Sequence, residues 1–482
     1  MKIAACWVFS VVFYVLSCLS ANAADVIIKG NNPDYAGETI SIFAYNNQIT
    51  STENELAKTK VDSSGNFEWH FSISQTRYVF IHAGIYFVFL YAQPGMVYTV
   101  KLPPRSDKTI ADKLNPYFEE TKVHLVITDL YTEDGTRITD LQNELNFLIR
   151  TLDDYFNPFI VKYAYRVYTE QNISDMDSAM VKMEHMFGNI SDPYFKQYYF
   201  YRFGYLKFTS TRFKSRNISA NYFLNRPVLY DNPAYMELFN QVYDKYFNYL
   251  GRDTDGKKIY TDINKDKSYT ELKETLRQVN DLADDSLTEL VILKGLHDGF
   301  YEMEFSRSAL LQILDSLILT TKIQKDIEIA NDIRQKVTKL LVGYAPPQFQ
   351  LYNQDSVLTT LADFKGKFVY LFFCTTQNYA CIKQYDYLTN IYEKFKQYVE
   401  IVTISVDDNF GEMRRFIKKT GYSWTFLNYG NQPSIIKEYD LRTLPTCYLI
   451  DRDGKLISSP APLPTENLEL HLFNILRSQK IL

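Results

Sequence analysis

The 482-residue chain is long enough for two or three domains at the usual size of about 150 residues each. Its formal net charge is −5, and acidic and basic residues are interspersed rather than gathered in blocks. This composition lacks the basic footprint of a nucleic-acid-binding protein, so we expect no nucleic-acid partner.

Residues 1–23 have the layout of a secretory signal peptide. Lys2 precedes an apolar run, and the small-residue pattern Ala21-Asn22-Ala23 follows it, as at a cleavage site. A retained transmembrane anchor is the alternative, but the run is short for a membrane-spanning helix. Another alternative is acylation of Cys18, because Val15-Leu16-Ser17 approximates a lipoprotein cleavage box. We expect a protein of the periplasm or cell envelope, either secreted or an outer-membrane lipoprotein that touches the membrane only through Cys18.

Three cysteines remain once the signal segment is set aside. Cys6 and Cys18 belong to that segment, whereas Cys374, Cys381 and Cys447 all lie in the last quarter of the chain. Three thiols are too few for a disulfide scaffold. They allow one internal bridge at most and leave one thiol over.

Residues 25–103 are predicted to form a small antiparallel β-sandwich, with a barrel as the alternative. The stretch "NFEWHFSI" at 66–73 alternates apolar and polar residues with the period of a half-buried strand. The run that follows is rich in aromatic and β-branched residues, and Pro94-Gly95 divides it into two strands.

An α-helical middle region is predicted from residue 115 to 340. Apolar residues recur at spacings of three and four, as in "LQILDSLILTTKIQKDIEIANDIRQKVTKLL" at 311–341. Residues 192–208 are unusually aromatic. Aromatic residues on helices usually fill a core, and a ligand or partner groove is the alternative.

Strands and helices alternate in residues 343–482, after two prolines in "YAPPQ" interrupt the helical pattern. Apolar runs at 367–375 and 401–406 fit buried strands, and a helical pattern at 388–399 lies between them. A hairpin around Arg452-Asp453-Gly454 and a closing helix follow. Such a chain builds a mixed sheet covered by helices on both faces.

Four motifs of this last region follow one another in the chain: "GYAPPQFQL" with "LADFKGKFVYLFF", "NYAC", "YDLRTLPTCYLIDRDGKLI" and "SPAPLP". As a set they resemble the extracytoplasmic TlpA/ResA-like thiol-disulfide oxidoreductases. The resemblance implies a C-terminal α/β thioredoxin fold, with "NYAC" at the active-site turn and Pro445 as the family's cis-proline. The N-terminal region of the chain also resembles the small β-domain that lies N-terminal to TlpA-like domains in secreted or lipid-anchored Bacteroidetes proteins.

The first residue of the active-site motif departs from the family. There a cysteine lies at a helix N-terminus, where the macrodipole and free N–H groups stabilise its thiolate. Asn378 takes that position here, and asparagine can cap a helix but cannot attack a disulfide. Cys381 matches the second, shielded cysteine. Ordinary two-cysteine exchange is therefore unavailable at this turn, and we expect weak or lost redox activity.

The resemblance places Cys374, Cys381 and Cys447 in one neighbourhood, with Cys447 two residues after Pro445. A bridge from Cys374 to either other cysteine is open, provided that their Cα atoms lie within about 7 Å. The alternative is that Cys374 and Cys447 are small buried hydrophobic residues.

Two functions follow for the chain. The first is an envelope thiol-disulfide oxidoreductase that acts through Cys381, with Cys374 or Cys447 as its partner and Pro445 positioning the substrate backbone. The second is a redox-inactive module that binds a peptide or protein by strand addition. A peroxiredoxin-like peroxidase is a more distant third, because its cysteine should stand near the position of Asn378.

No other catalytic motif competes with these functions. The chain has neither a phosphate-binding loop nor a zinc-protease motif, and we predict no cofactor and no metal. We expect the six histidines to be surface or packing residues. They are His70, His82, His124, His185, His297 and His471.

Overall fold

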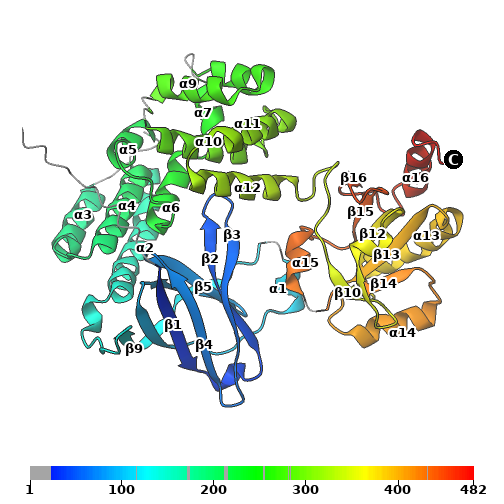
Figure 1. The fold of residues 1–482 in the computed structure, drawn as a ribbon, viewed down its shortest axis with the longest axis horizontal. Helices are drawn as coiled ribbons and strands as arrows, with labels where there is room; N and C mark the ends of the chain where they lie inside the picture. Colours follow the sequence, from blue (N-terminus) through cyan, green and yellow to red (C-terminus); the bar gives the residue numbers. More distant parts are fainter. Residues whose placement is uncertain are drawn as a thin grey trace, which may run out of the picture.

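The structure is a computed structural model that describes residues 23–115, 117–170, 174–210, 215–252, 256–280, 282, 284–430 and 432–482. A strand-rich N-terminal part, a helical middle and a C-terminal α/β domain follow one another along the chain (Figure 1). The predicted fold class is confirmed. Residues 1–22 of the expected signal peptide, with the expected lipid anchor Cys18, lie outside the described residues. Within the ranges given above, no helix is both long and apolar enough to cross a membrane.

The strand-rich part consists of two sheets. One has the order β4-β1-β7-β9 and contains β1 (Ala24–Asn31), β4 (Asn66–Ile73), β7 (Met96–Lys101) and β9 (Val126–Thr132). The other has the order β3-β2-β5-β6-β8 and contains β2 (Thr39–Asn47), β3 (Thr52–Lys60), β5 (Arg77–Ala83), β6 (Tyr86–Ala92) and β8 (Thr121–His124).

A shared apolar core makes these sheets a sandwich. Val26 and Trp69 of one sheet pack in the same buried cluster as Ile42 and Val79 of the other. β4 alternates exposed and buried residues along its whole length, as its sequence predicts. The pairing is mainly antiparallel, but β1 with β7 and β6 with β8 pair in parallel.

The strands continue beyond the end of the β-domain expected at residue 103. β8 and β9 lie in the stretch from residue 115 that we expected to be helical, and each forms the edge of one sheet. Their sequences, "TKVH" and "VITDLYT", contain threonine and charged residues and are largely exposed or half-buried. Short edge strands of this kind give little apolar signal, which is why the pattern did not predict them.

Helices fill the middle of the chain from Leu145 onward. They are α2 (Leu145–Glu170), α3 (Ser174–Phe187), α4 (Pro193–Ser210), α5 (Ser215–Tyr222), α6 (Pro233–Val242), α7 (Tyr246–Gly251), α8 (Lys258–Thr261), a π-helical turn (Asp262–Asp266), α9 (Tyr269–Asn280), α10 (Asp285–Gly299), α11 (Arg307–Thr320) and α12 (Gln324–Thr338).

The aromatic helix α4 packs into the core of this region. Phe195, Tyr198 and Tyr201 are buried and belong to one large apolar cluster, which agrees with the packing interpretation of residues 192–208. At the far end of the region, Lys336 of α12 donates a hydrogen bond of 2.6 Å to the carbonyl oxygen of Thr50. The helical region is thereby joined to the sandwich (Figure 1).

The C-terminal domain contains a five-stranded sheet of order β14-β13-β12-β15-β16 and a separate two-stranded sheet. Its elements are β10 (Gln350–Tyr352), β11 (Leu358–Thr360), β12 (Phe368–Cys374), α13 (Tyr379–Phe395), β13 (Val399–Ser405), α14 (Phe410–Thr420), β14 (Thr425–Asn428), α15 (Pro433–Glu438), β15 (Thr446–Ile450), β16 (Leu456–Ser458) and α16 (Leu468–Ser478).

Helices cover both faces of the five-stranded sheet, as expected. Leu388 of α13 and Leu472 of α16 belong to the apolar cluster on one face, and Ile435 of α15 belongs to the cluster on the other. β12 pairs in parallel with β13 and antiparallel with β15. All seven residues of β12 are buried, as its continuous apolar sequence predicts for a central strand.

A short helix of the N-terminal part reaches the C-terminal domain. α1 (Ile110–Leu114) lies beside α15 (Figure 1). The Nζ atom of Lys113 is 3.8 Å from Oδ1 of Asp408, and Nζ of Lys437 is 3.1 Å from Oε1 of Glu53. Because Asp408 follows β13, α1 meets the edge of the sheet at which the parallel strands β12 and β13 end.

Candidate functional site

The candidate site lies where β12 ends and α13 begins. Asn378 is the N-cap of α13, and its side chain accepts a 2.8 Å hydrogen bond from the backbone N–H of Ala380. The side chain of Asn378 is exposed, as is the neighbouring Tyr379. The predicted capping role of Asn378 is therefore confirmed, and this exposed position has no thiol.

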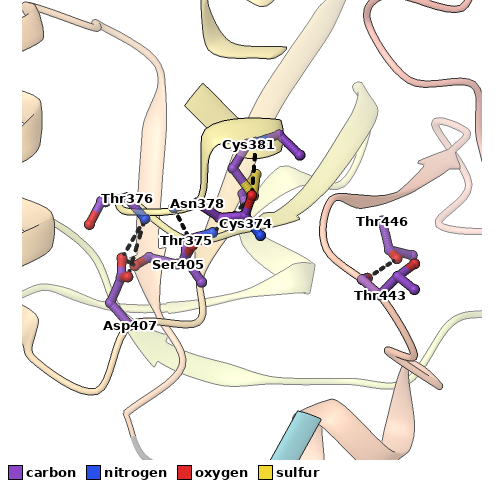
Figure 2. The surroundings of a disulfide bond; sticks show 10 residues. Cys374, Thr375, Thr376, Asn378, Cys381, Ser405, Asp407, Thr443 and Thr446 are labelled. Atoms are coloured by element: carbon purple, nitrogen blue, oxygen red, sulfur yellow. Dashed lines mark hydrogen bonds between the residues drawn. A yellow bond between two sulfur atoms is a disulfide. The ribbon is translucent and has the colours of Figure 1, made fainter. Parts of the chain in front are cut away.

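A disulfide joins Cys374, the last residue of β12, to Cys381 in the first turn of α13 (Figure 2). Their Cα atoms are 5.7 Å apart, within the range that a disulfide requires. Both cysteines are fully buried, and the backbone N–H of Thr375 points to the Cys381 sulfur at 3.3 Å. Of the two bridges left open by the sequence, this is the one that forms. The interpretation of Cys374 as a small buried hydrophobic residue is wrong, because its sulfur is bonded to that of Cys381.

Cys447 takes no part in the bridge. It lies in β15 opposite Phe372 and is free and fully buried. Burial raises the pKa of the Cys447 thiol to about 12, although a hydrogen bond with Tyr370 opposes the shift. Its thiolate is thus scarce at neutral pH, and only the thiolate is an effective nucleophile. The expectation that Cys447 behaves as a small buried hydrophobic residue agrees with this geometry.

Pro445 directly precedes β15 and has a cis peptide bond with Leu444. Leu444 and Thr443 belong to the same loop, and both line a groove of about 590 Å³ that also reaches Asn378. The loop that precedes Pro445 and the start of the "NYAC" turn thus line one groove, and the role of Pro445 in positioning a substrate stays a prediction.

Carboxylates also line this groove. They come from Asp407 and Asp408, which follow β13, and from Glu412 in α14. The buried Asp407 accepts hydrogen bonds from the backbone N–H of Thr376, at 3.0 Å, and from the hydroxyl of Ser405, at 2.6 Å (Figure 2). Asp407 thus fixes the loop between β12 and α13 to the end of β13.

Sequence reasoning did not select Asp407, Asp408 or Glu412. A signal was present, because "VDD" at 406–408 directly follows a buried parallel strand, and functional residues of open α/β sheets gather at that edge. Among the residues that the structure describes, no group of three or more His, Cys, Asp or Glu side chains could hold a metal ion.

The arrangement limits the chemistry available. Disulfide exchange requires a thiolate to approach one of the two bonded sulfurs, and here both cysteines are fully buried, with the backbone N–H of Thr375 directed at the Cys381 sulfur. At the exposed helix N-terminus the asparagine side chain offers only an amide. The groove, by contrast, is open and lined by polar groups.

The C-terminal region matches known proteins. The sequence model described as AhpC/TSA family matches residues 342–459. The thiol-disulfide oxidoreductase ResA of Bacillus thuringiensis is 34% identical over 143 residues, which cover 29% of this chain and 82% of the relative. ResA of Bacillus subtilis is 30% identical over 136 residues, or 28% of this chain and 75% of the relative.

Solved structures match the same region. A thiol:disulfide interchange protein from a Bacteroides species is 22% identical with a TM-score of 0.27, covering 29% of this chain and 92% of that chain. From the ResA identities and the AhpC/TSA match, the chain belongs through its C-terminal region to the AhpC/TSA, thioredoxin-like family of thiol-disulfide oxidoreductases.

Proposed function

We propose that this chain is an extracytoplasmic thioredoxin-fold protein that binds an extended segment of a partner protein, and that its redox activity is weak or lost. One observation carries the proposal: both sulfurs of the Cys374–Cys381 pair are buried, while the exposed residue at the helix N-terminus is Asn378. In this proposal the disulfide cross-links the site instead of exchanging with a substrate.

The groove supports the binding part of the proposal. Its volume of about 590 Å³ suits a few residues of extended chain, and the loop at Thr443 and Leu444 is partly exposed. Backbone groups at such a loop can pair with an extended peptide without any redox step. The side chains of Gln377 and Asn378 offer further hydrogen-bonding groups on the other wall.

The extracytoplasmic part of the proposal rests on the sequence of residues 1–23 and on the bridge, since disulfides persist in oxidising compartments. The exported protein is released or is held by a lipid at Cys18. Labelling with palmitate in the producing cells distinguishes the two, and a Cys18→Ala variant is the matched control.

A second candidate function is slow disulfide exchange through Cys374 and Cys381. The bridge favours it, because one of its two sulfurs belongs to Cys381, the residue at the family's second cysteine position. Exchange by this pair requires the first turn of α13 to open, so that an incoming thiolate reaches a sulfur and the other sulfur leaves as the thiolate.

Insulin reduction by dithiothreitol tests the redox part of the proposal. We expect the wild-type protein to accelerate it no more than the Cys381→Ala variant does. The Cys447→Ala variant removes a buried cysteine outside the bridge and is the matched control. Turnover that Cys381→Ala abolishes and Cys447→Ala retains would establish the second candidate instead.

A further inference from the structure

The groove beside Asn378 has an unbalanced charge. Asp407, Asp408 and Glu412 line it with carboxylates, and Arg442 supplies the cation among its lining residues. Arg442, however, already pairs with Asp440, since its Nε lies 3.1 and 3.2 Å from the two carboxylate oxygens of that residue. The side chains that line the groove therefore carry a net negative formal charge.

A cation from another part of the chain lies against this negative wall. Nζ of Lys113 in α1 is 3.8 Å from Oδ1 of Asp408, and both side chains remain partly exposed, at 22% and 35%. α1 belongs to the connection between β7 and β8 of the sandwich, so this lysine enters from the N-terminal part. Figure 1 shows α1 at the junction of the two parts.

The helix that carries Lys113 is held in place locally. Thr109 caps it, with reciprocal hydrogen bonds between Thr109 and Asp112. Such a capping box fixes the start of a short helix and, with it, the direction of the residues that follow. Lys113 is thus held beside Asp408, one of the residues that line the groove, and the pair of Lys113 with Asp408 is long and solvent-accessible, which makes it weak.

The geometry points to a partner segment that carries a lysine or arginine, whose cation displaces Lys113 from Asp408 when the segment enters the groove. This inference rests on the proposed function and adds the chemical class of the partner. Asp408, whose Oδ1 also accepts a hydrogen bond from the Tyr429 hydroxyl, attracts the incoming cation. Glu412 adds negative charge beside it, although Glu412 accepts a 2.7 Å hydrogen bond from Gln377 and lies 4.0 Å from Arg415. Lys113 competes with it from within the chain, and a neutral or acidic segment gains no electrostatic attraction from Asp408 when it enters.

Three fluorescein-labelled peptides test the inference on the full-length chain by fluorescence anisotropy. They are Gly-Ser-Val-X-Val-Ser-Gly, acetylated and amidated, with lysine, threonine or glutamate at X. We expect the lysine peptide to bind about tenfold more tightly than the threonine peptide, and the glutamate peptide to bind most weakly. Raising the salt concentration should reduce the preference, because the groove is open to solvent.

Two variants of the chain assign the preference to the right residues. Asp408→Asn should weaken binding of the lysine peptide about fivefold and leave the threonine peptide unchanged. Lys113→Ala should strengthen binding of the lysine peptide about threefold, because the competing cation is gone. Lys394→Ala is the matched control, since it removes the same charge from the far end of α13, where Lys394 pairs with Glu469.

Each failure has its own meaning. Equal binding of the three peptides overturns the inference and leaves the proposed binding groove intact. No binding of any peptide overturns both the inference and the binding part of the proposed function. Weaker binding of the lysine peptide to Lys113→Ala overturns the competition, because Lys113 would then support the ligand.

Discussion

The Cα atoms of Cys374 and Cys381 lie 5.7 Å apart, and a disulfide between them ties the end of β12 to the first turn of α13. Cys381 lies three residues after Asn378, the exposed N-cap of α13, which is where a C-x-x-C motif would have its first cysteine. The partner of Cys381 is thus a cysteine at the end of the strand and not residue 378. Both bonded cysteines belong to the buried core of the domain.

Removal of the bridge should lower the stability of the protein. The disulfide closes a loop of sequence separation seven, for which lost chain entropy predicts a stabilisation of about 2–3 kcal/mol. We expect the double variant Cys374→Ala/Cys381→Ala to lose about that free energy of unfolding in urea titrations followed by circular dichroism.

The control for this prediction is the wild-type protein with a reductant. Dithiothreitol added to the unfolded protein should lower the unfolding midpoint of the wild type and leave that of the double variant unchanged. Identical midpoints for oxidised wild type and double variant would contradict a stabilising bridge.

A cysteine at position 378 should give the protein disulfide-exchange activity above that of the wild type. Asn378 is exposed at the N-terminus of α13, where the helix dipole lowers the pKa of a thiol. Cys374 must be removed at the same time, because otherwise it stays bonded to Cys381 and leaves no partner for the new cysteine. We expect Asn378→Cys/Cys374→Ala to reduce insulin about tenfold or more faster than the wild type.

The matched control for this gain of activity is Asn378→Ser with Cys374→Ala, which keeps a capping side chain but has no thiol at the helix start. It should be inactive in the same assay. If the double variant with cysteine folds and is equally inactive, the remainder of the site, and not residue 378 alone, prevents exchange.

The buried Asp326 of α12 should make the stability fall as the pH rises. Burial and the neighbouring Glu289 carboxylate raise the pKa of Asp326 to about 7 from an ordinary value of 3.8, although Tyr230 donates it a hydrogen bond of 2.9 Å. Its stabilising contribution is complete below pH 3.8 and is lost as the pH rises through 7.

Asp326→Asn keeps an acceptor for Tyr230 and cannot ionise. The unfolding free energy of the variant minus that of the wild type should be larger at pH 8 than at pH 4 by on the order of 2 kcal/mol. Urea titrations at both pH values measure the difference. A constant difference would show that Asp326 does not titrate in this range.

His82 should make a smaller pH-dependent contribution of its own. Its Nδ1 lies 2.7 Å from Glu120 and its Nε2 3.3 Å from Glu53. Burial lowers the pKa of His82, but the hydrogen bonds with the two glutamates outweigh it and raise the pKa to about 9. The contribution is complete below the ordinary value of 6.5 and is lost as the pH rises through 9.

The comparison of His82→Gln with the wild type isolates this effect. Glutamine retains a hydrogen-bond donor without the charge. Because the His82 side chain is one-third exposed, we expect the wild type to lose only about 2 °C more than the variant in Tm between pH 6.5 and 9.5. Parallel pH profiles of Tm would contradict a protonated His82.

The sequence predicted most of the C-terminal domain, because its signals are local. A continuous apolar run such as that of β12 specifies a buried central strand, and the alternation of β4 specifies a strand with one buried face. β8 and β9 gave no such signal. β8 pairs with β6 and β9 pairs with β7, and these partners are distant in the sequence. The local residue pattern therefore does not reveal the pairing.

The site was predictable in part. Asn378 as the cap and Cys381 in the first helical turn follow from the motif. The choice of Cys381 over Cys447 as the bonded partner of Cys374 depends on which side chains point toward each other, and spacing along the chain does not contain that information. The approach of Lys113 to Asp408 depends on how two parts of the chain meet, which periodicity cannot predict.

Peptide mapping after alkylation tests the central claim most directly. Trypsin releases Cys374 and Cys381 together in the peptide of residues 368–383, and Cys447 in the peptide of residues 443–452. Protein secreted into an oxidising compartment is held in its native state with reduced glutathione, then unfolded and alkylated. We predict an unalkylated, bridged 368–383 peptide and an alkylated Cys447. Two alkyl groups on the 368–383 peptide, at a level that rises with glutathione, would show an accessible exchange centre and contradict the account.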